Sequence, residues 1–223
     1  MKMTKKKVFV TALVISLVAI ISMGTLAWFS DSKSVNNEFF IASTDDDTAD
    51  EAFSVKLEET EAGPYKEILP GDTLDKNPTI YNTGHYDQYI RVTIKITNAK
   101  NFVDYIAGGS STLTASVFPG FVASNWESDD NFNGNYDQNT DEITYVLYYN
   151  GILESNQYVR VFTDVVIPEG LTRDQAAKFN EGDAANSFSI NIKADAVQTQ
   201  NVGAVSTATD AANAKTAFTT VGM

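Results

Sequence analysis

The stretch Tyr89-Ile-Arg-Val-Thr-Ile-Lys-Ile-Thr97 decides the fold class of this chain. Apolar and polar residues alternate along it with a period of two, so an extended backbone has one apolar and one polar face. Most of its residues are β-branched or aromatic, which favours a strand over a helix. The stretch therefore predicts a long strand that buries Ile90, Val92, Ile94 and Ile96.

Weaker strand patterns lie on both sides of this stretch and are separated by turn signals. The predicted strands cover residues 53–58, 77–81, 111–118, 143–149, 158–167 and 188–197. Pro70-Gly71-Asp72 and Asn150-Gly151 mark turns between them. Short helices are expected at 101–106 and at 172–179, the second with Thr172 as its N-cap. About eight strands without long alternating helices predict an all-β domain, an antiparallel β-sandwich or jelly roll with short helices in connecting loops.

The beginning of the chain has the parts of a secretory signal peptide. Four lysines precede the apolar run Val8–Met23, and small residues follow it. Thr25 and Ala27 suit the −3 and −1 positions of a cut between Ala27 and Trp28. The alternative is a permanent membrane anchor, because residues 8–29 reach the roughly 20 residues that a span needs. Cleavage is favoured because the apolar run weakens before this bond, and the lysines predict that the N-terminus stays in the cytoplasm.

These patterns divide the chain into four parts. Residues 1–27 form the signal peptide, 28–52 an N-terminal segment and linker, 53–202 the β domain and 203–223 a C-terminal tail. The linker is acidic, and its simplest interpretation is a solvated spacer. Ahead of the acidic residues, Phe39-Phe40-Ile41 is a short apolar run that suits addition to a sheet edge. The tail has little hydrophobic pattern and only weak helical character.

Composition limits the classes of function. Acidic residues outnumber basic ones 29 to 16 in the 223 residues, and removing 1–27 shifts the formal net charge from −13 to −17. Nucleic-acid binding is therefore not expected, because phosphate neutralisation requires clusters of Lys and Arg. The chain has no cysteine. Thiol catalysis and disulfides are thus excluded, and the exported domain relies on its core alone.

Catalytic motifs are scarce. His85 is the single histidine, and it lies in the turn-like segment Asn82–Asp87. A helical zinc-protease site needs two histidines on one face, so that site is excluded. A serine triad would have to use His85, for which an exposed turn is the simpler interpretation. No catalytic residues are predicted from these patterns.

One segment resembles a calcium-binding loop. Oxygen-bearing side chains recur at Asp129, Asn131, Asn133 and Asp137, with Gly134 at the position of the sharp turn. Position 12 of the loop is Thr140, where a bidentate Glu is expected. Flanking helices are also missing. An Asp/Asn-rich hairpin loop is therefore the alternative, and calcium is the only cofactor that these residues suggest.

Several segments together resemble the TasA/camelysin family of exported proteins from Gram-positive bacteria. The most informative are the octet Gly24–Asp31 at the export site and Leu69-Pro-Gly-Asp-Thr-Leu-Asp-Lys76. Weaker similarities follow in the strand motifs, and they are Tyr81–Gly84, Tyr89–Val92, Tyr148–Leu153, Phe162–Pro168 and Ile192–Gln198. The similarity covers most of the exported chain.

This resemblance implies a jelly-roll protein that a SipW-type signal peptidase processes and that builds extracellular biofilm matrix fibres at the cell surface. It implies that the partner is a second copy of the chain, with other matrix components as further partners. The freed N-terminal segment would be donated as a strand to the neighbouring subunit, and Phe29 and Phe39–Ile41 lie in the matching segment. A donated strand satisfies the unpaired backbone groups of a sheet edge, and a head-to-tail contact of this kind propagates.

Two other classes of function stay open at this point. Camelysin carries a metalloprotease description, so a secreted metal-dependent peptidase is one alternative, although the sequence supplies no recognisable ligand set. The other is a surface adhesin or carbohydrate-binding module in which Trp126, Tyr148 and Tyr149 stack on sugars. Alternation along a strand more often places such aromatic residues in the core or in cross-strand pairs.

Overall fold

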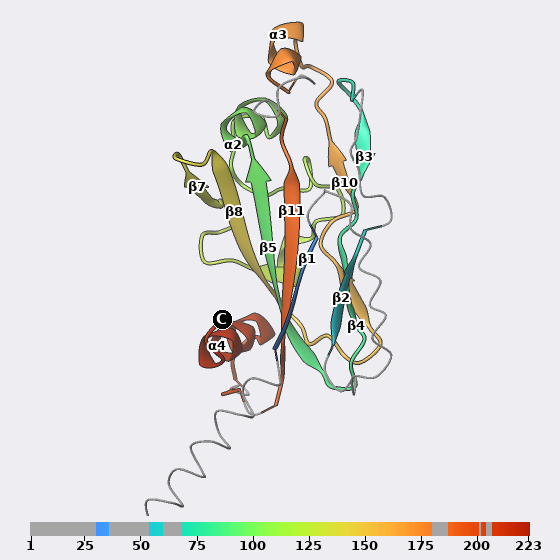
Figure 1. Cartoon of the computed structure of the whole chain (residues 1–223), viewed down its shortest axis with the longest axis vertical. Coiled ribbons are helices and arrows are strands. Elements are labelled where there is room, and N and C mark those ends of the chain that lie inside the picture. The colour runs from blue at the N-terminus through green and yellow to red at the C-terminus, as the bar shows by residue number, and fades with distance from the viewer. Residues whose placement is uncertain (1–29, 36–53, 60–67, 180–186, 201, 204–206) are drawn as a thin grey trace, which may run out of the picture.

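The computed structural model describes residues 30–35, 54–59, 68–179, 187–200, 202–203 and 207–223 (Figure 1). The signal peptide, its cleavage site and the segment from Phe39 to Ile41 lie outside the described residues. The strands are β1 Ser30–Val35, β2 Val55–Glu58, β3 Thr73–Asp75, β4 Thr79–Asn82, β5 Gln88–Thr97, β6 Trp126–Glu127, β7 Asn135–Asp137, β8 Glu142–Tyr149, β9 Tyr158–Arg160, β10 Asp164–Val166 and β11 Ile190–Gln198. The helices are α2 Ala99–Asn101, α3 Arg173–Ala176 and α4 Asp210–Thr220, with single turns η1 Phe102–Ile106, η2 Ala123–Asn125 and η3 Ala177–Phe179.

All strand pairs among the described residues are antiparallel. The largest sheet has the order β1-β11-β5-β8-β6, and β7 pairs with the other end of β8. A second sheet has the order β2-β4-β9, and β3 pairs with β10. Figure 1 shows β2, β3, β4 and β10 beside the largest sheet. The predicted all-β class with antiparallel sheets is therefore confirmed, while the finer jelly-roll assignment stays a prediction.

The core lies between the sheets and follows the alternation of β5. Ile90, Val92, Ile94 and Ile96 are fully buried, whereas Arg91 is on the opposite face of the strand. The apolar face of β5 is flanked in the same sheet by buried residues of β8 and β11. Those residues are Ile143, Tyr145, Leu147, Ile190, Ile192, Ala194 and Ala196. Val55 and Ile80 complete the core from β2 and β4.

Two of the predicted strands, 111–118 and 158–167, do not form single strands in the structure. Residues 111–118 form turns, and the backbone N–H of Phe118 donates to the Thr114 carbonyl at 2.9 Å. Leu113, Val117 and Phe118 are buried from these turns, so the apolar pattern of residues 111–118 did not require a strand. The predicted strand 158–167 is divided into β9 and β10. Val161 and Phe162 are both fully buried, which interrupts the alternation between the two short strands.

The predicted helix with Thr172 as N-cap is confirmed as α3 and η3. The Thr172 hydroxyl accepts a hydrogen bond from the Gln175 backbone N–H at 3.3 Å. In return, the Thr172 backbone N–H donates to the Gln175 side-chain oxygen at 2.9 Å. This reciprocal arrangement is a capping box. It satisfies two backbone groups at the start of the helix.

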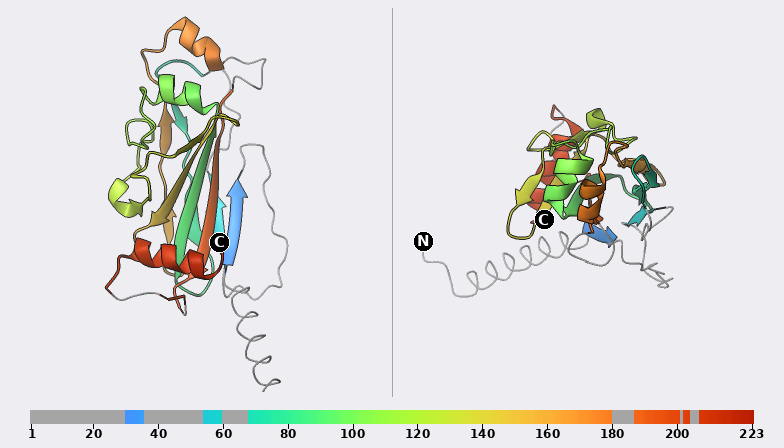
Figure 2. Two further views of the ribbon diagram at one scale, coloured as in Figure 1. Left: turned by 90° about the vertical axis from the view of Figure 1, so that its left-hand side faces the viewer. Right: turned by 90° about the horizontal axis from the view of Figure 1, so that it is seen from above.

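The C-terminal tail is part of the packed domain. Helix α4 lies across one end of the largest sheet, as Figure 2 shows. Ala211, Ala214, Ala217 and Phe218 are buried on one side of it. Their spacing of three to four residues is that of a helix face. Because alanine contributes little to a hydrophobic pattern, the sequence alone predicts a separate tail at 203–223.

A buried ion pair joins the residue that follows β2 to the residue that follows β3. The Lys76 ammonium donates to both oxygens of the Glu59 carboxylate, at 2.8 and 2.9 Å. The two side chains are only 4% and 2% exposed. Burial lowers the pKa of Lys76, and the Glu59 carboxylate opposes that shift. Removal of either side chain would leave the other buried charge less well compensated, which is costly at this depth.

Gly120 provides a stability prediction. Its φ is +81°, and an added Cβ would lie 2.8 to 3.0 Å from three atoms of Thr163, including the backbone nitrogen. Gly120→Ala therefore adds both backbone strain and a clash, and we expect it to lower the free energy of unfolding by about 3 kcal/mol. Gly108→Ala is the matched control, because Gly108 has φ +65° with no atom within 4 Å of the added Cβ. Urea denaturation of both variants measures the difference, and equal losses would contradict the predicted clash.

Candidate assembly edge

The first described strand closes the edge of the largest sheet. β1 pairs antiparallel with β11, in a register that runs from Ser30 opposite Val197 to Val35 opposite Ile192. The opposite side of β11 pairs with β5. Figure 1 and Figure 2 show β1 lying along β11, on the side of the sheet nearest to β2. A segment only a few residues beyond the predicted cleavage site thus covers the β11 edge within one molecule.

The register identifies the backbone groups that β1 covers. The Thr97 N–H donates to the Ser189 carbonyl, so odd-numbered residues of β11 direct their backbone groups toward β5. Even-numbered residues therefore direct theirs toward β1, and these are Ile192, Ala194 and Ala196. Ser34 and Lys193 consequently form a non-hydrogen-bonded pair, the type with the shorter Cα separation of about 4.5 Å.

The sequence of β1 indicates that backbone hydrogen bonds provide most of its attachment. Its residues are Ser-Asp-Ser-Lys-Ser-Val, so only Val35 is apolar. Such a strand has little apolar area to bury, in contrast to β5 or β8. A strand that is held chiefly by its backbone exchanges for an equivalent strand with little loss of specific contacts.

A charge network lies on the outer face of the same edge. The Arg91 guanidinium on β5 donates to one oxygen of Asp195 on β11, through Nε at 3.2 Å and a terminal nitrogen at 2.7 Å. Lys193 lies 2.9 Å from the other carboxylate oxygen. The Asp195 side chain is 1% exposed, and Asp195 is opposite Ser32 of β1 in the register. Pairing with two cations compensates for burial of the carboxylate.

Three of the four residues of the predicted calcium loop, Asp129, Asn133 and Asp137, contact different partners. Asp129 lies 2.7 Å from the Lys215 ammonium, and the Asn133 side-chain oxygen accepts from Thr112 at 2.6 Å. Asp137 accepts from the Asn139 backbone N–H at 2.8 Å, which lowers the pKa of Asp137. Within the described ranges, no three His, Asp or Glu side chains are grouped as metal ligands. Calcium binding stays a prediction that these contacts do not support.

The other candidate residues also lie apart from any common site. His85 is exposed in the turn between β4 and β5. Trp126 is buried opposite Tyr149, with ring centroids 5.5 Å apart. The Tyr148 ring packs 6.2 Å from that of Phe218. The three aromatic residues proposed for sugar stacking are therefore engaged in cross-strand and helix contacts. Phe29 and Phe39–Ile41 lie outside the described residues, as do Thr25, Ala27 and Trp28.

Comparison with known families agrees with the resemblance. Residues 3–105 match the family model described as camelysin metallo-endopeptidase. Over these residues, which make up less than half of the chain, the sequence is similar to the camelysin family. The match runs from the predicted signal peptide through β1 and β5 into η1. No curated protein and no solved structure shows a significant match to the chain.

The camelysin family description names a metal-dependent activity, but the donor set of this chain does not fit a peptidase metal. The sequence contains one histidine and no cysteine. Carboxylates are numerous, yet Asp129, Asp195 and Glu59 each contact a lysine or arginine. Among the described residues, no helix is long and apolar enough to cross a membrane.

Two features of the assembly edge were missed by sequence reasoning. The Arg91–Asp195 pair joins residues 104 positions apart, and only the register of β5 and β11 brings them together. In the sequence, both residues are ordinary polar positions of alternating strands. The strand β1 itself is too polar to give a strand signal, although residues 29–41 were expected to serve as a donated strand. A pairing partner, and not a local pattern, makes this segment extended.

Proposed function

We propose that this protein is a secreted structural subunit of extracellular biofilm matrix fibres, and that it assembles head to tail by donating its N-terminal strand. The observation that carries the proposal is the pairing of β1 with the β11 edge of its own sheet. The edge accepts this strand in a defined register, so the same strand from a second copy fits it equally well. Exchange between copies replaces intramolecular pairs by identical intermolecular pairs.

The length of chain after β1 allows such an exchange. Residues 36–53 separate β1 from the start of the described domain. An extended segment of that length spans up to about 60 Å. Because each subunit then donates one strand and accepts another, the contact does not close and a filament grows. Removal of a signal peptide near Ala27 by a SipW-type peptidase would free the strand from the membrane.

The strand order gives support to the jelly-roll part of the proposal. β1 lies beside β11, the last strand in the sequence, and β11 lies beside β5. Neighbours in the sheet are therefore far apart in the chain, as long Greek-key connections produce. The acidic composition and the absence of cysteine fit an exported protein that is stabilised by its core and kept soluble by charge.

Truncation tests the proposal. Deletion of residues 29–41 removes the donated strand, and we expect the variant to be exported as monomers that form no filaments. Electron microscopy and size-exclusion chromatography of protein from the culture medium measure this outcome. Circular dichroism of the truncated protein serves as the control for folding. Filaments of unchanged abundance from the truncated chain would remove the donated strand from the mechanism.

A secreted metal-dependent peptidase is the second candidate, because the family description names that activity. We expect no hydrolysis of casein by the purified protein, with or without added zinc or calcium, since no suitable set of ligands is present in the sequence. Metal analysis of the same sample completes the test. Chelator-sensitive cleavage that purifies together with the protein would establish the peptidase instead.

A further inference from the structure

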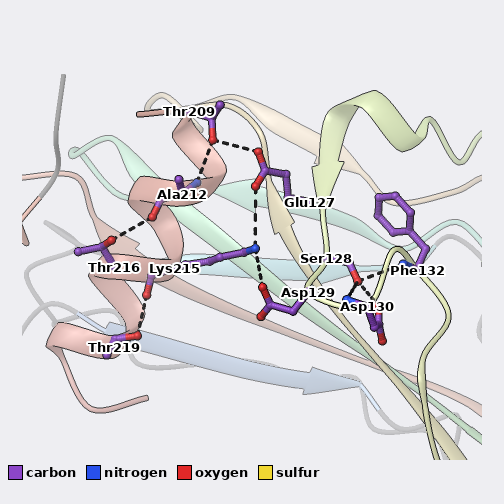
Figure 3. Close-up of polar contacts among 10 residues, drawn as sticks. All are labelled: Glu127, Ser128, Asp129, Asp130, Phe132, Thr209, Ala212, Lys215, Thr216 and Thr219. Carbon is purple, nitrogen blue, oxygen red and sulfur yellow. Dashed lines mark hydrogen bonds and ion pairs between the residues drawn. The ribbon is translucent and has the colours of Figure 1, made fainter. Parts of the chain in front are cut away.

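Helix α4 is fixed to the outer face of the largest sheet by apolar and polar contacts. Ala214, Ala217 and Phe218 pack against Tyr89 and Val197 of β5 and β11. At the other side of the helix, the Thr209 hydroxyl donates to Glu127 at 2.9 Å, and Lys215 lies 2.7 Å from Asp129 (Figure 3). The polar contacts connect α4 to β6 and the following loop, whereas the apolar contacts connect it to the strands near the assembly edge.

One residue of α4 contacts the charge network of that edge. The Arg91 guanidinium carbon lies 4.6 Å from the centroid of the Phe218 ring, within the range of a cation–π contact. The Phe218 side chain is 1% exposed, so the contact is removed from water. The ring therefore limits the orientations that the guanidinium can adopt while it donates to Asp195.

Arg91 connects Phe218 to the part of β11 that pairs with β1. Arg91 holds the Asp195 carboxylate, and Asp195 occupies the middle of β11 opposite Ser32 of β1. Loss of the correct Arg91 orientation would weaken one of the ion pairs of the buried Asp195 carboxylate, while the contact with Lys193 stays in place. A less well compensated charge in the middle of β11 would weaken the pairing of β11 with β1.

We propose that Phe218 is a positioning residue for the assembly edge, which acts through Arg91 and Asp195 to set how readily β1 leaves β11. The C-terminal helix and the N-terminal strand are thereby coupled through the sheet. The consequence for fibre growth rests on the proposed function, but the coupling itself is a property of the single molecule. A second copy is not needed to observe it.

Hydrogen–deuterium exchange of the monomeric exported protein tests the coupling. Phe218→Leu keeps an apolar side chain and removes the aromatic ring, and we expect the amides of residues 30–35 to lose protection by about tenfold. Phe218→Trp restores a ring, so protection should return to near the original value. Lys215→Ala is the matched control, because it loosens α4 from Asp129 without removing the contact with Arg91. The amides of residues 142–145, at the end of β8 away from Tyr148 and α4, should be unchanged in all three variants.

The route through Arg91 has its own test. In an Arg91→Ala background the guanidinium is absent, so the further change Phe218→Leu should have no additional effect on the protection of residues 30–35. Equal protection of the original protein and Phe218→Leu would overturn the inference. A full additional effect in the Arg91→Ala background would also overturn it, because packing alone would then be responsible. Filament formation is measured separately, so failure of the proposed function and failure of this coupling are distinguishable.

Discussion

A disulfide between β1 and β11 of the same molecule should abolish filament formation. The variant Ser34→Cys/Lys193→Cys places two thiols at a non-hydrogen-bonded pair of the register, where the Cα separation of about 4.5 Å suits a disulfide. The chain has no other cysteine, so no competing bridge forms within it. Oxidation of the monomer before assembly would lock β1 in place. Electron microscopy should then show no filaments, and reduction with dithiothreitol should restore them.

Each single-cysteine variant is the control for this experiment. Lys193→Cys also removes the ion pair with Asp195, so its own effect on assembly must be subtracted. We expect both single variants to form filaments under the same oxidising conditions. Filaments from a fully bridged monomer would show that β1 does not need to leave its own β11. Mass spectrometry of the alkylated protein measures the extent of bridging.

The second large effect is expected from Arg91→Ala. This variant removes the guanidinium from a buried carboxylate, and we expect the free energy of unfolding to fall by about 3 kcal/mol, the lower end of the cost of breaking a buried ion pair. The lower end applies because Lys193 still contacts the other oxygen of Asp195. Urea denaturation with an unchanged m-value measures the loss.

Lys95→Ala is the matched control, since Lys95 is on the same face of the same strand. Its partner Glu142 is 3.0 Å away, but both side chains are partly exposed, at 44% and 26%. Exposed pairs contribute up to about 1 kcal/mol, so the control should lose far less stability. The double variant Arg91→Ala/Asp195→Ala should lose less than the sum of the two single variants, because it leaves no buried charge. Equal losses for Arg91→Ala and Lys95→Ala would contradict the role of burial.

The parts of the fold that sequence predicts are those in which local pattern and tertiary environment agree. β5 buries one face along its length, so its alternation of Ile and Val with polar residues identifies it directly. The cap at Thr172 is equally local, because its hydrogen bonds join residues three positions apart. In contrast, residues 111–118 are apolar enough for a strand, but Leu113, Val117 and Phe118 bury their side chains from turns.

The candidate site depends on contacts that no local pattern contains. Resemblance to a family suggested that residues 29–41 serve as a donated strand, but the acceptor edge follows only from the pairing of β1 with β11. Arg91 and Asp195 lie on the polar faces of their strands, so the sequence predicts that their side chains are exposed. Helix α4 covers one end of this face, where Phe218 contacts Arg91, and the Asp195 side chain is buried. The alanines of α4 give only a weak hydrophobic pattern in the sequence, because small side chains pack closely but contribute little hydrophobicity. The packing of α4 on the sheet is therefore not predicted from the sequence.

The most direct measurement uses the Ser34→Cys/Lys193→Cys variant after assembly. Filaments are grown from the reduced protein, oxidised in place and separated by non-reducing gel electrophoresis. If each subunit donates β1 to its neighbour, the disulfides join different chains, and a ladder of covalent oligomers is expected. A single band of internally bridged monomers from intact filaments would show that β1 stays on its own β11, and it would contradict the exchange of strands between subunits.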